Sequence, residues 1–180
     1  ERRTRAVALR RGLPVEAREL ASLDPEAIER VRGEERPDPR NPEEVHDHLL
    51  SLVLCPAVPE LRKHFDVLVA QGRAVEFELP GALLWCATER RRAAQVIHPQ
   101  AQARPEARLL PPLPPALARE PEPERQASIR ELIRGHLDRA GPVTAASLAA
   151  PVALAVADVD LALADLEAEG FALRGEFEVK

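Results

Sequence analysis

Several residue types are scarce in this 180-residue chain, and each scarcity excludes something. No apolar run approaches the ~18 residues of a membrane span, and the arginine-rich start at 1–5 is not followed by the apolar core of a secretory signal. Cys55 and Cys86 have no CxxC spacing, so we expect free thiols in a reducing cytoplasm. Methionine is absent, which suggests a piece of a longer chain.

Lysine is almost missing as well. Lys63 and Lys180 are the only two, so arginine supplies nearly all the positive charge. The planar guanidinium of arginine binds phosphate and stacks on bases better than the lysine ammonium does, but a GC-rich genome also encodes such a composition. The net charge of -5 argues weakly against a dedicated nucleic-acid binder. Composition therefore leaves both interpretations open, and only local clusters of charge can decide between them.

One pattern occurs twice along the chain. The first copy is a helix-like run (61–71), Gly72, a strand-like run (73–79), a Pro80-Gly81 turn and a second apolar run (83–86). The second copy is 159–169, Gly170 and 171–180. Helix, glycine, strand, turn and strand is the layout of a winged helix, a fold that usually binds nucleic acid or other protein modules. The sequence thus predicts a mostly α-helical α+β protein with two winged-helix-like units.

Composition shifts divide the chain into four parts. We predict a lead-in segment (1–23), a first unit (24–103), a proline-rich extended linker (104–123) and a second unit truncated in its wing (124–180). Seven of the 18 prolines lie in the linker. Helices are expected after the caps or prolines at Asp24, Asn41, Pro59, Thr88, Thr144 and Asp158. For the last of these helices the predicted buried stripe is Leu161, Ala164, Leu166 and Ala168.

Two basic clusters are candidate nucleic-acid-binding residues. Arg62, Lys63 and His64 lie near the start of the first unit's third helix, where winged helices usually contact the duplex. Arg90, Arg91 and Arg92 begin the helix after the wing. Both clusters can neutralise phosphates, and the alternative is an ordinary solvated face.

Trp85 is the only tryptophan, in a chain with 3% aromatic residues. It lies on the predicted wing strand. An exposed indole there would stack on a nucleobase, and the alternative is a core position.

Other candidates are weaker. The second unit's third helix carries Asp158, Asp160, Asp165, Glu167 and Glu169, so it should repel phosphate and pack on protein. His46 and His48 are two residues apart on a helix and should point to different sides, which disfavours zinc. No nucleotide-binding, hydrolase or metalloprotease motif occurs. We therefore expect no catalytic residue, metal or cofactor within this chain.

Four segments in this order resemble the region downstream of the motor in Lhr-type (large helicase-related) bacterial helicases. They are 36–40 leading into 44–52, 84–90, 141–144 and 166–177, and the resemblance covers about 24–177. The last segment is the most specific. One departure is 150–153, where family members often have a leucine-glycine turn.

The resemblance implies an ATP-dependent DEAD/DEAH-box helicase linked to DNA repair. ATP and Mg would bind in two RecA-like domains upstream, and this region would help to close around the tracking single strand of DNA or of a DNA/RNA hybrid. An aromatic in the segment matching 84–87 would stack a base, which favours Trp85.

Three hypotheses follow. The first is a non-catalytic module that contacts nucleic acid, which requires paired hairpins and an exposed indole. The second is a structural or protein-interaction module that docks onto a motor domain. The third is a DNA glycosylase-like module, for which Gln100 and Gln102 are the only motif.

Overall fold

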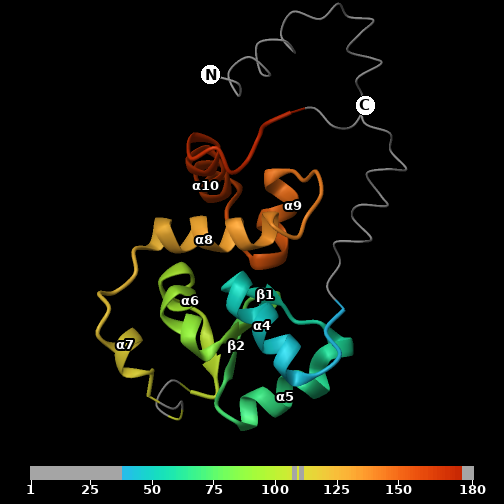
Figure 1. Ribbon diagram of the computed structural model, residues 1–180, viewed down its shortest axis with the longest axis vertical. Helices are drawn as coiled ribbons and strands as arrows, with labels where there is room; N and C mark the ends of the chain where they lie inside the picture. Colours follow the sequence, from blue (N-terminus) through green and yellow to red (C-terminus); the bar gives the residue numbers. More distant parts are fainter. Residues whose placement is uncertain (1–37, 107–108, 110–111, 176–180) are drawn as a thin grey trace, which may run out of the picture.

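The computed structural model describes residues 38–106, 109 and 112–175 (Figure 1). A small antiparallel sheet has helices on both faces, and a helical layer of α8, α9 and α10 lies across one end. The helices are α4 (Pro42–Leu52), α5 (Arg62–Ala70), α6 (Arg91–Ile97), α7 (Pro115–Ala118), α8 (Arg125–Leu137), α9 (Ala145–Ala149) and α10 (Val156–Ala168). The strands are β1 (Cys55–Pro56), β2 (Ala74–Leu79), β3 (Ala82–Ala87) and β4 (Gln102–Arg104). Short 3-10 turns cover Pro59–Leu61, Thr88–Arg90 and Ala150–Val152. The lead-in segment and the helix expected at Asp24 lie outside the described residues.

The layout predicted for 61–87 is confirmed. α5 is followed by Gly72 with φ 71°, and the β2–β3 turn has Gly81 with φ 79°, conformations that favour glycine. Phe77 lies opposite Leu84 in the hairpin. β1 pairs with β3 and β4 with β2, which gives the strand order β1-β3-β2-β4.

Alternation along the hairpin buries both faces of the sheet. Val75, Phe77, Leu84 and Cys86 pack into the core that includes α6 and α8. Ala74, Trp85 and Ala87 pack on the other side with residues of α4 and α5. Both faces of the β2–β3 hairpin are therefore covered over most of its length, whereas Leu83 near the turn is 36% exposed.

One apolar core joins the two predicted units. It includes Val75 and Phe77 of the sheet, Ile129 and Leu132 of α8, and Leu166 of α10. The linker between the units contains α7 and is tied to α6, because Arg92 Nη1 donates to the carbonyls of Leu117 (3.1 Å) and Glu120 (2.9 Å). The described parts of the two predicted units thus share one core.

The predicted helix starts meet mixed outcomes. The Asn41 side chain accepts the Glu44 N–H at 2.9 Å, and Thr144 accepts the Ser147 N–H at 3.1 Å, so both caps are confirmed. Thr88 does not cap a helix, because its buried hydroxyl donates to the Gly72 carbonyl at 2.7 Å and α6 begins only at Arg91.

The last helix differs from its prediction. α10 begins at Val156 after Ala155, and Asp158 lies in its first turn instead of capping it. The buried residues are Val159, Ala162 and Leu166, whereas Leu161 is 53% exposed, so the predicted stripe is wrong except at Leu166. The small Ala162 side chain can face α8 closely, and this packing overrides the greater hydrophobicity of Leu161.

The predicted second wing is not seen among the described residues. Gly170 has φ 76°, as its counterpart Gly72 does, but residues 171–175 form no strand and 176–180 lie outside the described residues. Two winged-helix units are therefore not established. Within the described ranges, no helix combines the length and apolar character needed to cross a membrane.

Candidate interaction site

Trp85 lies in the core, which corrects the expectation that it stacks on a base. Trp85 is 1% exposed, and its ring stacks on the Phe65 ring, with centroids 4.0 Å apart and planes 6° from parallel. The indole Nε1 donates to Glu76 Oε2 at 3.2 Å. α5 covers the face of β3 that carries Trp85, so burial of the large ring decides its place.

Arg62 is held by carboxylates. Its Nε donates to Asp66 at 2.8 Å, and its Nη1 donates at 2.6 Å to the same Glu76 oxygen that accepts from Trp85. The guanidinium also lies 5.8 Å from the centre of the Phe65 ring. Arg62 therefore stabilises the buried Glu76 carboxylate and is poorly placed to neutralise a phosphate.

Lys63 and His64 occupy the first turn of α5. Lys63 is exposed and His64 is half-buried, and neither makes an ion pair within the described part of the chain. Of the six basic candidates, these two are the ones that geometry leaves available to an anion.

The second basic cluster serves the fold. Arg90 Nε donates to the carbonyl of Leu50 at 2.9 Å, and Arg92 holds the linker as described above. Arg91 is half-buried, and desolvation lowers the pKa of its guanidinium. Arg90 and Arg92 thus have partners within the chain.

The two histidines of α4 take different surroundings. His46 is buried, with Nε2 3.3 Å from Glu89 Oε2 and Nδ1 3.1 Å from Arg73. His48 lies near His136 of α8 and near Arg139, which follows α8, and its Nδ1 is buried without a hydrogen-bond partner among the described residues. Within these residues, no group of three or more His, Cys, Asp or Glu side chains is placed to hold a metal ion.

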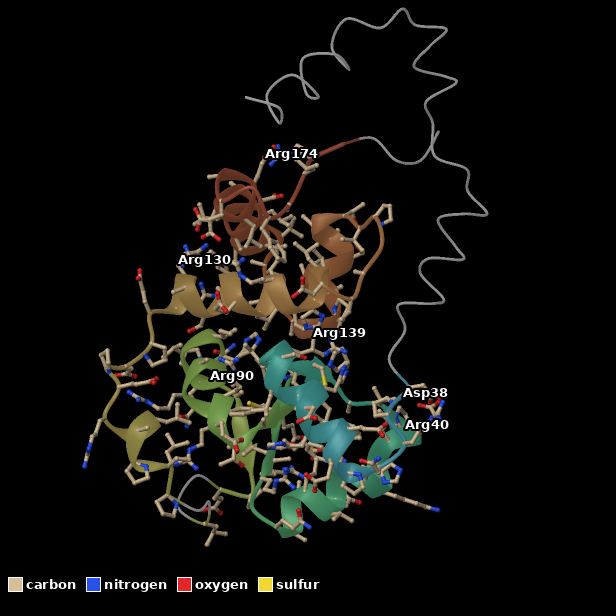
Figure 2. The ribbon with its side chains drawn as sticks, viewed as in Figure 1. Asp38, Arg40, Arg90, Arg130, Arg139 and Arg174 are labelled. Atoms are coloured by element: carbon tan, nitrogen blue, oxygen red, sulfur yellow. The ribbon has the colours of Figure 1, made fainter. Side chains whose placement is uncertain are left out.

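A close contact between α4 and α8 was not anticipated from the sequence. A Cβ at Gly135 would overlap the backbone carbonyl of Ser51, so glycine is needed where α8 crosses the end of α4. Arg139 donates to Ser51 Oγ at 2.8 Å, and His136 Nε2 is 2.9 Å from the Leu54 carbonyl oxygen. Figure 2 shows Arg90 and Arg139 near this crossing. A helical glycine in an otherwise good helix sequence was the only available signal.

The cysteines are free and buried, as expected. Burial raises the pKa of the Cys55 thiol to about 12, and burial also raises the pKa of the Cys86 thiol well above its ordinary value. Neither thiol is therefore a nucleophile at neutral pH.

The acidic side chains of α10 are partly used by α8. Arg125 donates to both carboxylate oxygens of Asp158, with the shorter contact at 2.7 Å. Arg130 and Arg134 both pair with Glu169. These carboxylates thus pair with arginines of their own chain.

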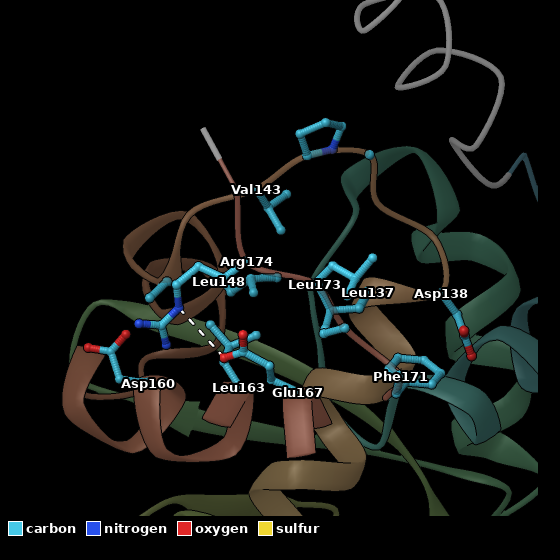
Figure 3. A pocket seen from close by; sticks show the side chains of 15 residues that line it. Leu137, Asp138, Val143, Leu148, Asp160, Leu163, Glu167, Phe171, Leu173 and Arg174 are labelled. Atoms are coloured by element: carbon cyan, nitrogen blue, oxygen red, sulfur yellow. Dashed lines mark ion pairs between the residues drawn. The ribbon is translucent and has the colours of Figure 1, made fainter. Parts of the chain in front are cut away.

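A cavity of about 600 Å³ lies at the α8–α9–α10 end of the molecule (Figure 3). Its apolar lining comes from the end of α8, the α8–α9 loop, both following helices and the segment after α10. The main contributors are Leu137, Val143, Leu148, Leu163, Phe171 and Leu173.

Three of these apolar side chains face solvent. Val143 and Phe171 are each 39% exposed and Leu173 is 78% exposed. The segment that carries Leu173 is tied down just before it, because the Phe171 N–H donates to the Leu166 carbonyl at 2.9 Å and Arg134 lies 4.7 Å over the Phe171 ring. The cavity therefore has anchored walls and an apolar rim.

The charged lining of the cavity is mainly acidic. Asp138, Asp160 and Glu167 contribute carboxylates, and Arg174 is the one basic side chain that lines it. Arg174 Nε lies 3.8 Å from Glu167 Oε2, the ion pair marked in Figure 3. Sequence reasoning identified Asp160 and Glu167 as part of an acidic helix but did not place them beside an apolar cavity.

Comparison with known proteins adds no assignment: no protein-family model matches the chain, and no curated protein matches it significantly.

Proposed function

We propose that this chain is a non-catalytic docking module that binds another protein domain through the α8–α9–α10 end. The observation that carries the proposal is the 600 Å³ cavity with apolar side chains at its open rim. Exposed apolar surface bordered by polar groups is typical of protein-interaction sites.

The internal contacts favour docking over nucleic-acid clamping. The indole that would stack on a base is 1% exposed, and Arg62, Arg90 and Arg92 donate to groups of their own chain. A phosphate backbone would have to compete with these partners and with a net charge of -5.

We propose further that the parent protein is an Lhr-type helicase and that the docking partner is its RecA-like motor. Support comes from the four ordered segments described above. ATP and Mg would then act in the motor and not in this chain, and the module would help to hold the motor around a single strand.

Titration of the 180-residue chain into separately produced RecA-like domains, which the proposal places upstream in the same reading frame, tests this proposal by calorimetry. We expect a dissociation constant of about micromolar or tighter, as for a small domain interface. No heat of binding to the motor, together with tight binding of single-stranded DNA, would contradict the docking function and favour nucleic-acid binding as the function of this chain.

Nucleic-acid contact at the start of α5 is a second candidate. The specific observation is that Lys63 is exposed, and the neighbouring His64 half-exposed, without ion pairs in the described part of the chain. Such a contact would be weak, insensitive to sequence and lost at high salt.

Substitution of Lys63 tests this second candidate. Lys63→Glu should weaken binding of a fluorescent single-stranded oligonucleotide and lower the dependence of log affinity on log salt by about one. Arg40→Glu is the matched control, because the Arg40 side chain is 82% exposed and lies away from α5 in sequence. Equal losses in the two variants would mean a general charge effect and no site at α5.

A further inference from the structure

We infer that the α8–α9–α10 cavity binds a protein segment with a large apolar anchor flanked by arginine or lysine. This inference rests on the docking function proposed above and specifies the chemistry of the partner. Three observations support it: the apolar rim, the acidic lining, and the charge repulsion that a symmetric pair of copies of this chain would create at the cavity.

The apolar part of the cavity specifies the anchor. Leu148 is 7% exposed at its base, whereas Val143 and Leu173 are at least 39% exposed at its rim. A leucine or phenylalanine side chain that entered would cover these groups and remove apolar surface from water. The lining offers aliphatic groups and one phenyl ring, which suits an amphipathic segment laid into a groove.

The charged part specifies the flanks. The lining includes three carboxylates, those of Asp138, Asp160 and Glu167, but only one basic group, that of Arg174. Glu167 already shares charge with Arg174, but Asp138 and Asp160 are both exposed. A segment with Arg or Lys beside its anchor would meet these carboxylates, and a segment with acidic flanks would be repelled.

A second copy of this chain fits less well. A symmetric pair would place the same patch against itself, so the carboxylates of one copy would face those of the other. The net charge of -5 adds to this repulsion. The partner should therefore be a different, basic segment.

A pair of synthetic peptides tests the chemistry directly. One fluorescein-labelled amphipathic peptide carries leucines on one face and arginines on its flanks, and the other has glutamate in place of each arginine. We expect polarisation changes when the 180-residue chain binds the arginine peptide, and none with the glutamate peptide. Equal binding of both peptides would overturn the assigned charge preference.

Three variants locate the binding on the surface. Leu173→Ser and Asp160→Lys should each weaken binding of the arginine peptide about tenfold or more, as for central interface residues. Leu161→Ser is the matched control, because Leu161 is 53% exposed on α10 but does not line the cavity. Circular dichroism should confirm that all three exposed substitutions leave the fold intact. An unchanged affinity of Leu173→Ser would exclude the cavity.

Two further measurements separate this inference from the proposed function. If the motor domains bind wild-type chain and Leu173→Ser equally well, the cavity assignment fails while the docking function stands. If the motor domains bind neither while the arginine peptide still binds, the proposed function fails and the cavity chemistry stands. If sedimentation shows a dimer of the free chain that Leu173→Ser abolishes, the occupant is a second copy and the inference is wrong.

Discussion

At the residue scale, the role of a side chain in this protein depends on which element covers it. The Trp85 ring stacks on the Phe65 ring. The indole N–H of Trp85 and the guanidinium of Arg62 donate to the same Glu76 oxygen. Trp85, Glu76 and Arg62 form one hydrogen-bonded network on this face of the sheet. An indole in this place contributes packing and a satisfied hydrogen bond, and the chain keeps its only tryptophan for stability.

Trp85 should behave as a core residue in solution. Because it is 1% exposed, its fluorescence should resist quenching by acrylamide and should not change when single-stranded DNA is added. Trp85→Ala should lower the free energy of unfolding by about 3–5 kcal/mol, as for a large aromatic removed from a core. A stable Trp85→Ala variant with altered DNA affinity would contradict this placement.

Gly135 offers a test in which local and tertiary effects oppose each other. Alanine would favour helix α8 by about 1 kcal/mol, but its Cβ would overlap the Ser51 carbonyl of α4. We expect Gly135→Ala to lower the free energy of unfolding by about 1–3 kcal/mol, since overpacking forces the backbone to shift. Urea denaturation measures the difference.

Gly170→Ala is the comparison for this substitution. A Cβ at Gly170 would meet no atom within 4 Å, so the cost there comes only from φ 76° and should be about 1–2 kcal/mol. A stabilised Gly135→Ala variant would mean that α4 and α8 do not approach as described.

At the element scale, the crossing of α4 and α8 gathers two imidazoles and the Arg139 guanidinium. His48 lies beside His136 and Arg139, and its Nδ1 has no partner among the described residues. Desolvation, followed by Arg139 and His136, lowers the pKa of His48 to about 4 from its ordinary 6.5. Burial also lowers the pKa of His136. The crossing is therefore built for neutral imidazoles.

This arrangement predicts loss of stability in mild acid. The folded state keeps His48 neutral while the unfolded state binds a proton below pH 6.5, so the free energy of unfolding should fall as pH drops from 6.5 to about 4. The carboxylates of Glu43 and Asp158, whose pKa values are lowered first by hydrogen bonds from Arg73 and Arg125, lose their contribution only below their ordinary values of 4.5 and 3.8. The interval between 6.5 and 4.5 thus reports mainly on histidine.

His48→Gln should flatten the pH dependence in that interval, because the variant has no imidazole to protonate at the crossing. Urea denaturation at several pH values gives the slope. Parallel curves for the variant and the wild-type chain would show that His48 does not contribute to the acid sensitivity.

At the scale of the whole molecule, one core crosses the predicted boundary between units. Side chains of the sheet, α6, α8, α9 and α10 belong to the same apolar cluster. Arg92 also ties the linker to α6. The shared core consequently holds the α8–α10 layer, and with it the cavity, against the sheet. A binding surface on such a rigid support suits docking.

Unfolding should therefore be a single cooperative transition. Trp85 reports on the sheet and α5, while far-ultraviolet circular dichroism reports on all helices, including α8 and α10. The two signals should give the same urea midpoint. An earlier loss of helical signal at constant tryptophan fluorescence would mean that the α8–α10 layer unfolds by itself.

The sequence by itself determined the local features: the caps at Asn41 and Thr144, the glycine after α5, the β2–β3 turn and the free state of the cysteines. These depend on contacts within a few residues, so composition and spacing reveal them. Only the tertiary structure decided that Trp85 is buried, that Arg62 and Arg92 are used internally, and which face of α10 packs on α8. Burial and pairing depend on which distant element covers a side chain, and no local pattern carries that information. The cavity also depends on the fold, because its walls come from consecutive elements between Leu137 and Gly175 whose packing angles are set by tertiary contacts.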